Sequence, residues 1–127
     1  MIKQIELGEL NKKESKQLHL HPFFLKLMDF WYNRYSNIYV YYNEDNKILG
    51  LLSARGNYIN ILYVLEKNRG IGSKLVYYAE QVIKRKKGFN KIITTTSLKE
   101  CLGFWKRQGY HIKTKILGLY NLRKELN

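Results

Sequence analysis

The sequence has little cysteine, little proline and few acidic residues, and each shortage excludes a class of protein. A single cysteine in 127 residues rules out an internal disulfide and fits a reducing compartment. One proline and nine glycines leave no room for a collagen-like or proline-rich segment. No apolar run approaches the ~18 residues that span a bilayer, and the amino-terminal residues lack the apolar stretch of a signal peptide. We therefore expect one cytoplasmic domain over residues 1–127, without a membrane partner.

Positive charge is what the chain has in excess. It carries 23 Lys and Arg residues against ten Asp and Glu residues, a formal net charge of +13. Such a balance favours anionic partners, such as nucleic acids or phosphate-rich ligands. The basic residues are dispersed, and the densest cluster, residues 84–87, would complement the dipole at the end of a predicted helix. A nucleic-acid-binding module stays open as an alternative, although no known binding motif accompanies the charge.

The hydrophobic pattern predicts a mixed α/β domain with the element order β-α-α-β-β-β-α-β-α-β-β. Gly56 and Asn57 separate two apolar runs, which is typical of a hairpin turn. From Ile71 the apolar residues recur at helical spacing, and Gly88 is expected to stop that helix. The predicted strands cover residues 1–7, 38–42, 48–53, 58–65, 91–96, 110–116 and 119–122. The predicted helices cover residues 11–17, 22–35, 71–88 and 97–109.

The segment between the strand at 58–65 and the helix at 71 has the composition of a phosphate-binding loop. Gly70 and Gly72 let the backbone approach a ligand closely, and the first N–H groups of the helix would then face an anion. Lys67 and Arg69 add positive charge. The spacing matches neither the P-loop nor the three-glycine dinucleotide fingerprint. The pattern predicts a phosphate cradle, with a plain strand-to-helix turn as the structural alternative.

Two segments carry a resemblance to a known family. Lys67-Asn68-Arg69-Gly70-Ile71-Gly72 resembles motif A of the GNAT N-acetyltransferases, Arg/Gln-x-x-Gly-x-Gly/Ala, and residues 104–110, Phe-Trp-Lys-Arg-Gln-Gly-Tyr, are similar to the family's Phe-Tyr-x-x-x-Gly-Phe. The resemblance implies the GNAT fold, a mixed and mostly antiparallel sheet with helices on both faces. It also implies acetyl-CoA as co-substrate, no metal, and direct attack of an amine acceptor on the acetyl thioester.

The resemblance also implies roles for individual residues. The backbone of Leu62 and Val64 would line the pantetheine arm. The pyrophosphate would be held by Lys67, Asn68, Arg69, Gly70, Ile71, Gly72 and Ser73. Trp105 stands where many members have the tyrosine that protonates the departing thiolate, and because indole is no acid we expect Trp105 to pack against the cofactor instead.

The usual catalytic acid and base are therefore both missing, since the strand at 58–62 also lacks the glutamate that many members use as a base. An amine that is already partly neutral at pH 7, such as an α-amine, needs less help from a base. We therefore favour such an acceptor slightly. A catalytically weak protein that binds coenzyme A remains an alternative.

Two reactive side chains near the second motif have structural explanations. Ser97 and Glu100 have the spacing of a capping box, in which the carboxylate bonds to the backbone at the start of a helix. Cys101 falls on the apolar face of that predicted helix, where cysteine is more often a small core residue than a nucleophile.

The histidines and tyrosines give weaker indications. The pair at positions 19 and 21 lacks further ligands, and His111 is distant in sequence, so a metal site is not expected. The tyrosines are mostly strand formers. Three of them are candidates to lie beside the thioester, and the sequence does not distinguish between them: Tyr39, Tyr41 and Tyr63.

Overall fold

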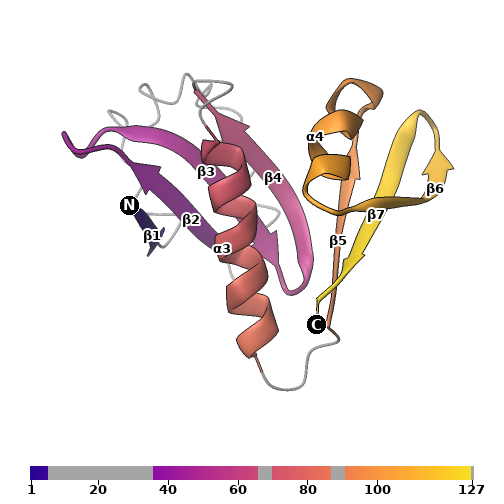
Figure 1. Cartoon of the computed structure of the whole chain (residues 1–127), viewed down its shortest axis with the longest axis horizontal. Coiled ribbons are helices and arrows are strands. Elements are labelled where there is room, and N and C mark those ends of the chain that lie inside the picture. Colours follow the sequence, from indigo (N-terminus) through magenta and orange to yellow (C-terminus); the bar gives the residue numbers. More distant parts are fainter. Residues whose placement is uncertain (6–35, 66–69, 87–90, 127) are drawn as a thin grey trace.

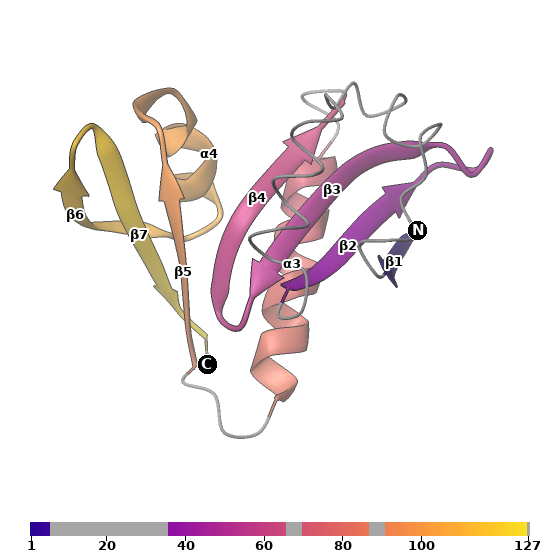
Figure 2. The same cartoon turned by 180° about the vertical axis from the view of Figure 1, so that it is seen from behind.

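The computed structural model describes residues 1–5, 36–65, 70–86 and 91–126, which form a seven-stranded sheet with two α-helices against one face (Figures 1 and 2). The elements are β1 (Ile2–Ile5), β2 (Ser36–Tyr42), β3 (Ile48–Arg55), β4 (Tyr58–Val64), α3 (Ile71–Arg85), β5 (Ile92–Ser97), the 3-10 turn η2 (Lys99–Cys101), α4 (Leu102–Arg107), β6 (His111–Ile116) and β7 (Leu119–Glu125). All seven predicted strands are present. The helices predicted at 11–17 and 22–35 lie outside the described residues.

The sheet has the strand order β1-β2-β3-β4-β5-β7-β6. The pair β4–β5 is parallel, and the other neighbouring pairs in the described chain are antiparallel. The predicted hairpin turn at Gly56-Asn57 is confirmed, and Gly56 adopts the positive φ of 60° that such a turn favours. This order places α3 in the connection between the two parallel strands.

A β-bulge in β4 changes the course of that strand at its third residue. Ser53 of β3 pairs with Ile61, and the next residue, Ala54, pairs with Ile59, so Asn60 is an extra residue without a partner on β3. A bulge bends its strand and increases the local twist. The pairing between β4 and β5 stops at the residue before it, since it covers only Tyr58 and Ile59. The two strands then diverge, as Figure 1 shows.

The core has two parts, one on each face of the sheet. On one face, α3 buries Leu75, Val76 and Ala79 against strand residues such as Leu52 and Ile93. The predicted apolar face of this helix is therefore confirmed. A second buried cluster on the meander contains Ile38, Val40, Ile48 and Leu51. None of the helices in the described ranges is long and apolar enough to cross a membrane.

The predicted end of α3 at Gly88 is wrong, because the helix stops at Arg85. Lys86 has an extended backbone (φ −73°, ψ 132°), and its N–H bonds to the carbonyl of Ile83 at 3.2 Å. The basic last turn, with Lys84 and Arg85, is present as expected and complements the helix dipole.

The predicted capping box is also wrong. Ser97 is the last residue of β5, buried and paired with Tyr120, and its hydroxyl donates to the carbonyl of Leu98 at 2.8 Å. Its side chain therefore caps no helix. Leu98 occupies the cap position of η2, which has no side-chain cap hydrogen bond. The following helix, α4, ends at Arg107 with Gln108 as its C-cap, and Gly109, the predicted stop, comes next with φ at 92°.

Candidate functional site

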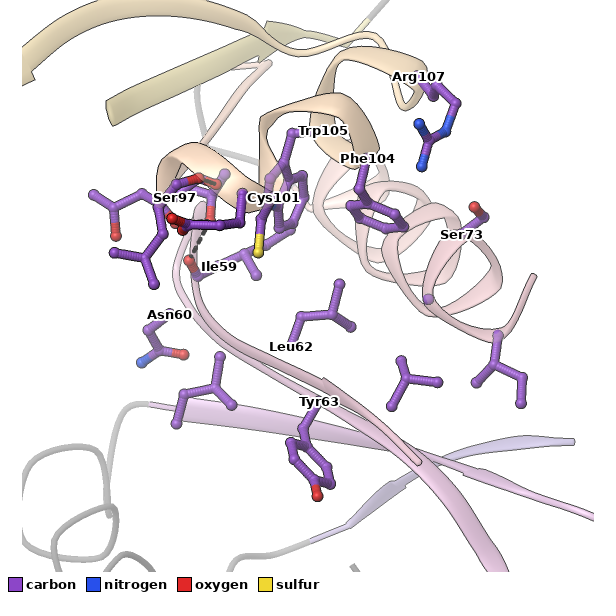
Figure 3. A pocket seen from close by; sticks show the side chains of 18 of the residues that line it. Ile59, Asn60, Leu62, Tyr63, Ser73, Ser97, Cys101, Phe104, Trp105 and Arg107 are labelled. Carbon is purple, nitrogen blue, oxygen red and sulfur yellow. Dashed lines mark hydrogen bonds between the residues drawn. The ribbon is translucent and has the colours of Figure 1, made fainter. Parts of the chain in front are cut away.

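An open cavity of about 970 Å³ lies where β4 and β5 diverge (Figure 3). Its walls come from β4, the start of α3, the end of β5, η2 and α4. The Thr95 hydroxyl donates to the carbonyl of Ile59 at 2.9 Å and ties the two strands together at the last paired residues. The cleft is therefore closed at the point of divergence and widens away from it.

The open side of β4 can pair with an extended ligand. Beyond Ile59, no described strand pairs with the β5-facing edge of β4. Leu62 and Val64 line the cavity along this stretch and pack against the core on the α3 side. An extended chain with amide groups can add to such an edge as a further strand would.

The amino end of α3 forms the second wall and offers backbone donors. Gly70 precedes the helix in a left-handed conformation (φ 73°), and its carbonyl accepts from the N–H of Lys74 at 3.0 Å. The N–H groups of Ile71, Gly72 and Ser73 belong to the first turn, which has no intrahelical acceptors for them. The first turn contains no acidic residue. The helix dipole therefore favours an anion at this end.

The close approach of α3 and α4 explains the second glycine of the loop. A Cβ added at Gly72 would lie 3.2 Å from a ring carbon of Phe104, tighter than an ordinary contact. Gly72 therefore lets α4 pack beside the start of α3. Of the loop residues predicted to hold phosphates, Gly70, Ile71, Gly72 and Ser73 line the cavity, whereas Lys67, Asn68 and Arg69 lie outside the described residues.

Arg107 is a further residue that lines the cavity. It lies in the last turn of α4 and lines the same cavity as Ser73. Figure 3 shows both residues at the same end of the cavity, away from Ser97. A guanidinium beside the amino end of a helix adds positive charge where an anion is already favoured. In the sequence, Arg107 occupies one of the variable positions of the segment 104–110, so no pattern marked it as a binding residue.

Trp105 lines the cavity and also belongs to the core. The residue is 5% exposed, and its ring packs edge-on against Phe104 at 5.1 Å and against Tyr110 at 5.0 Å between centroids. The indole N–H is a donor only and does not ionise in the physiological range. The side chain is therefore a rigid apolar wall.

The expectation that Cys101 is a core residue is wrong. Cys101 is exposed and lines the cavity, as Figure 3 shows for its sulfur atom. The 3-10 turn at Lys99–Cys101 replaces the regular first turn of the predicted helix and changes the direction in which residue 101 points. Glu100 is also exposed and lines the cavity. With the capping box absent, its carboxylate has lost the structural role that the sequence predicted.

Among the three candidate tyrosines, only Tyr63 lines the cavity. Figure 3 shows its hydroxyl directed away from α4. Tyr39 is buried and packs edge-on against Tyr78 at 5.2 Å, and burial raises its pKa above the ordinary value. The ring of Tyr41 lies 5.7 Å from the ammonium group of Lys74. Within the described ranges, no three His, Cys, Asp or Glu side chains are grouped as a metal site would require.

Comparisons with known proteins agree with this geometry. The sequence profile of the acetyltransferase (GNAT) family matches residues 5–110. A search of proteins with curated functions found no significant match in sequence.

Solved structures give the same fold. An aminoglycoside 6′-N-acetyltransferase complexed with coenzyme A is similar with a TM-score of 0.77 at 13% identity, over 98% of this chain and 96% of that one. The N-acetyltransferase PseH of Campylobacter jejuni in complex with acetyl-CoA has a TM-score of 0.71 at 15% identity, over 100% of both chains. The PaiA N-acetyltransferase of Thermoplasma acidophilum in complex with coenzyme A has a TM-score of 0.70 at 11% identity, over 98% and 99% of the two chains.

These likenesses confirm the predicted fold, and the profile covers most of the chain. The family itself is shown by the profile, whose match covers residues 5–110. The chain belongs to the GNAT family of acetyltransferases.

Proposed function

We propose that this protein transfers the acetyl group of acetyl-CoA to an amine. The observation that carries the proposal is the cleft between β4 and β5, which has a free strand edge on one wall and the unneutralised amino end of α3 on the other. Acetyl-CoA has matching parts, namely an extended arm with two amides and an anionic pyrophosphate. The crystal complexes of similar folds with coenzyme A or acetyl-CoA support this reading.

The cofactor would lie with its arm along Leu62 and Val64 and its pyrophosphate on the amides of Gly70–Ser73, with Arg107 nearby. The loop residues Lys67, Asn68 and Arg69 would complete the phosphate site. The thioester would then reach the wall formed by Trp105, where the amine lone pair attacks the carbonyl carbon. The C–S bond breaks, the thiolate leaves, and the amine loses a proton.

Mass detection of acetyl transfer tests the proposal. The purified protein is incubated with acetyl-CoA and a panel of amines with pKa values from about 7 to 10.5. We expect acetylated product in excess of the uncatalysed control, with amines of lower pKa favoured at pH 7 because more of each is neutral. Tight binding of acetyl-CoA without transfer to any amine would instead indicate a coenzyme A-binding protein.

Glu100 is the one carboxylate among the described residues that line the cavity. We expect Glu100→Gln to lower kcat about tenfold or more with an amine of high pKa, and much less with an amine of low pKa, since only the former needs a base. The measurement is kcat for both amines between pH 6 and 9. Glu100 is thus the candidate base that deprotonates the amine. An equal loss of kcat with both amines, or no loss with either, would exclude it from that role.

The excess of positive charge should steer the anionic cofactor to the cleft. We expect the association rate of acetyl-CoA, measured by stopped-flow fluorescence, to fall several-fold between about 0.05 and 0.5 M salt, because the Debye length falls from about 14 Å to about 4 Å and the basic surface then attracts the phosphates over a shorter range. The dissociation rate should change less. An association rate independent of salt would mean that the net charge of +13 serves another partner.

A further inference from the structure

A polar contact joins the two helices that enclose the anion-binding end of the cleft. The side-chain amide of Gln108, just after α4, donates from Nε2 to the Oγ of Ser73 in the first turn of α3, over 2.9 Å. The two residues are 35 positions apart, and the contact is partly buried. Ser73 lines the cavity, whereas Gln108 does not.

The direction of this hydrogen bond has a chemical consequence. An amide nitrogen only donates, so the serine oxygen accepts through a lone pair. The hydroxyl proton of Ser73 is then not needed for Gln108 and is free to be donated elsewhere. Because the residue lines the cavity beside the backbone N–H groups of the helix start, this proton adds one more donor to that anion site.

The backbone of Gln108 is joined to a partly buried ionic network. The Lys124 ammonium group donates to the Gln108 carbonyl at 2.8 Å and to Glu80 Oε1 at 3.1 Å. The hydroxyl of Tyr110 donates to Glu80 Oε2 at 2.9 Å. Burial first, and the adjacent Glu80 carboxylate second, raise the pKa of Tyr110, so the phenol stays protonated and keeps donating. Of these hydrogen bonds, the one from Lys124 contacts Gln108 directly, and it fixes the backbone from which the glutamine side chain reaches Ser73.

We infer that Gln108 is a positioning residue, which turns the Ser73 hydroxyl into a donor for a phosphate oxygen of the cofactor. The inference rests on the proposed use of acetyl-CoA. The proposed phosphate site uses the backbone amides of the loop. The inference adds a role for Gln108, a residue of the second motif that does not line the cavity.

Variants at both positions test the inference by steady-state kinetics and calorimetry. We expect Gln108→Leu and Ser73→Ala each to raise KM for acetyl-CoA about tenfold with kcat nearly unchanged, the size expected for one hydrogen bond to a charged group. The double variant should have a KM for acetyl-CoA less than about twofold above that of either single variant, because both substitutions remove the same donor. Gln108→Glu should cost more than Gln108→Leu, because a carboxylate only accepts and would take the serine proton.

Acetyl-pantetheine, which lacks the phosphates, is the control substrate. Its KM should be the same for the wild-type protein and for Gln108→Leu. The inference is overturned if Gln108→Leu leaves the KM for acetyl-CoA unchanged, if the two single effects multiply in the double variant, or if acetyl-pantetheine is affected equally. A wild-type protein that does not bind acetyl-CoA at all would contradict the proposed function instead.

Discussion

Gly70→Asp should weaken binding of acetyl-CoA at least about a hundredfold. Gly70 precedes α3 in a left-handed conformation, and a Cβ added there meets no atom of the described residues within 4 Å, so the steric cost is the strain of that backbone conformation. A carboxylate about 5 Å from a phosphate charge costs roughly 3 kcal/mol at an effective dielectric of 20. Calorimetric titration of acetyl-CoA into both proteins measures the change.

Gly70→Asn is the matched control, because asparagine has nearly the same shape and tolerates the left-handed region as aspartate does. We expect it to lose only a few-fold in affinity, so the difference between the two variants isolates the charge. Aspartate at a helix start also favours the helix, so the melting temperature of Gly70→Asp should not fall below that of Gly70→Asn. Equal affinity of the two variants would show that no phosphate lies at this helix end.

Lys124→Met should lower the free energy of unfolding by about 3 kcal/mol and Tm by about 10 °C. Its partner Glu80 is 4% exposed, and the lysine side chain is 28% exposed. Removing the ammonium group leaves a buried carboxylate with the hydroxyl of Tyr110 as its one described hydrogen-bond donor. Breaking a buried ion pair from one side is costly because the remaining charge stays desolvated.

The double variant Glu80→Gln with Lys124→Met separates charge from packing. Glutamine can still accept from Tyr110 and carries no charge, so we expect the double variant to recover at least half of the lost stability. Chemical denaturation of the wild-type protein, of each single variant (Glu80→Gln and Lys124→Met) and of the double variant gives the coupling energy. If Lys124→Met costs less than about 0.5 kcal/mol, the ion pair contributes nothing and Glu80 is solvated in solution.

The strands and the helix that position the cleft could be predicted from the sequence, because their local hydrophobic pattern agrees with the faces that they bury in the fold. The meander follows from β-branched runs separated by Gly56-Asn57, and the buried face of α3 follows from its helical spacing. The glycines at 70 and 72 indicated the anion site. Few other residues permit the left-handed conformation of Gly70, and any side chain at residue 72 would crowd Phe104.

Other features depend on contacts between segments distant in sequence, which no local pattern encodes. Ser97 and Glu100 have the spacing of a capping box, but pairing of Ser97 with Tyr120 draws it into the sheet. The resulting 3-10 turn exposes Cys101. The buried position of Glu80 was equally hidden, since its partners Tyr110 and Lys124 follow it by 30 and 44 residues.

A crystal structure of the complex with acetyl-CoA tests the central claim most directly. We predict the pyrophosphate within hydrogen-bond distance of the N–H groups of Ile71, Gly72 and Ser73, and the pantetheine amides paired with the backbone of β4 between residues 60 and 64. The acetyl group should lie against Trp105. Acetyl-CoA bound outside the cleft between β4 and β5, or bound there with its phosphates away from α3, would contradict the account.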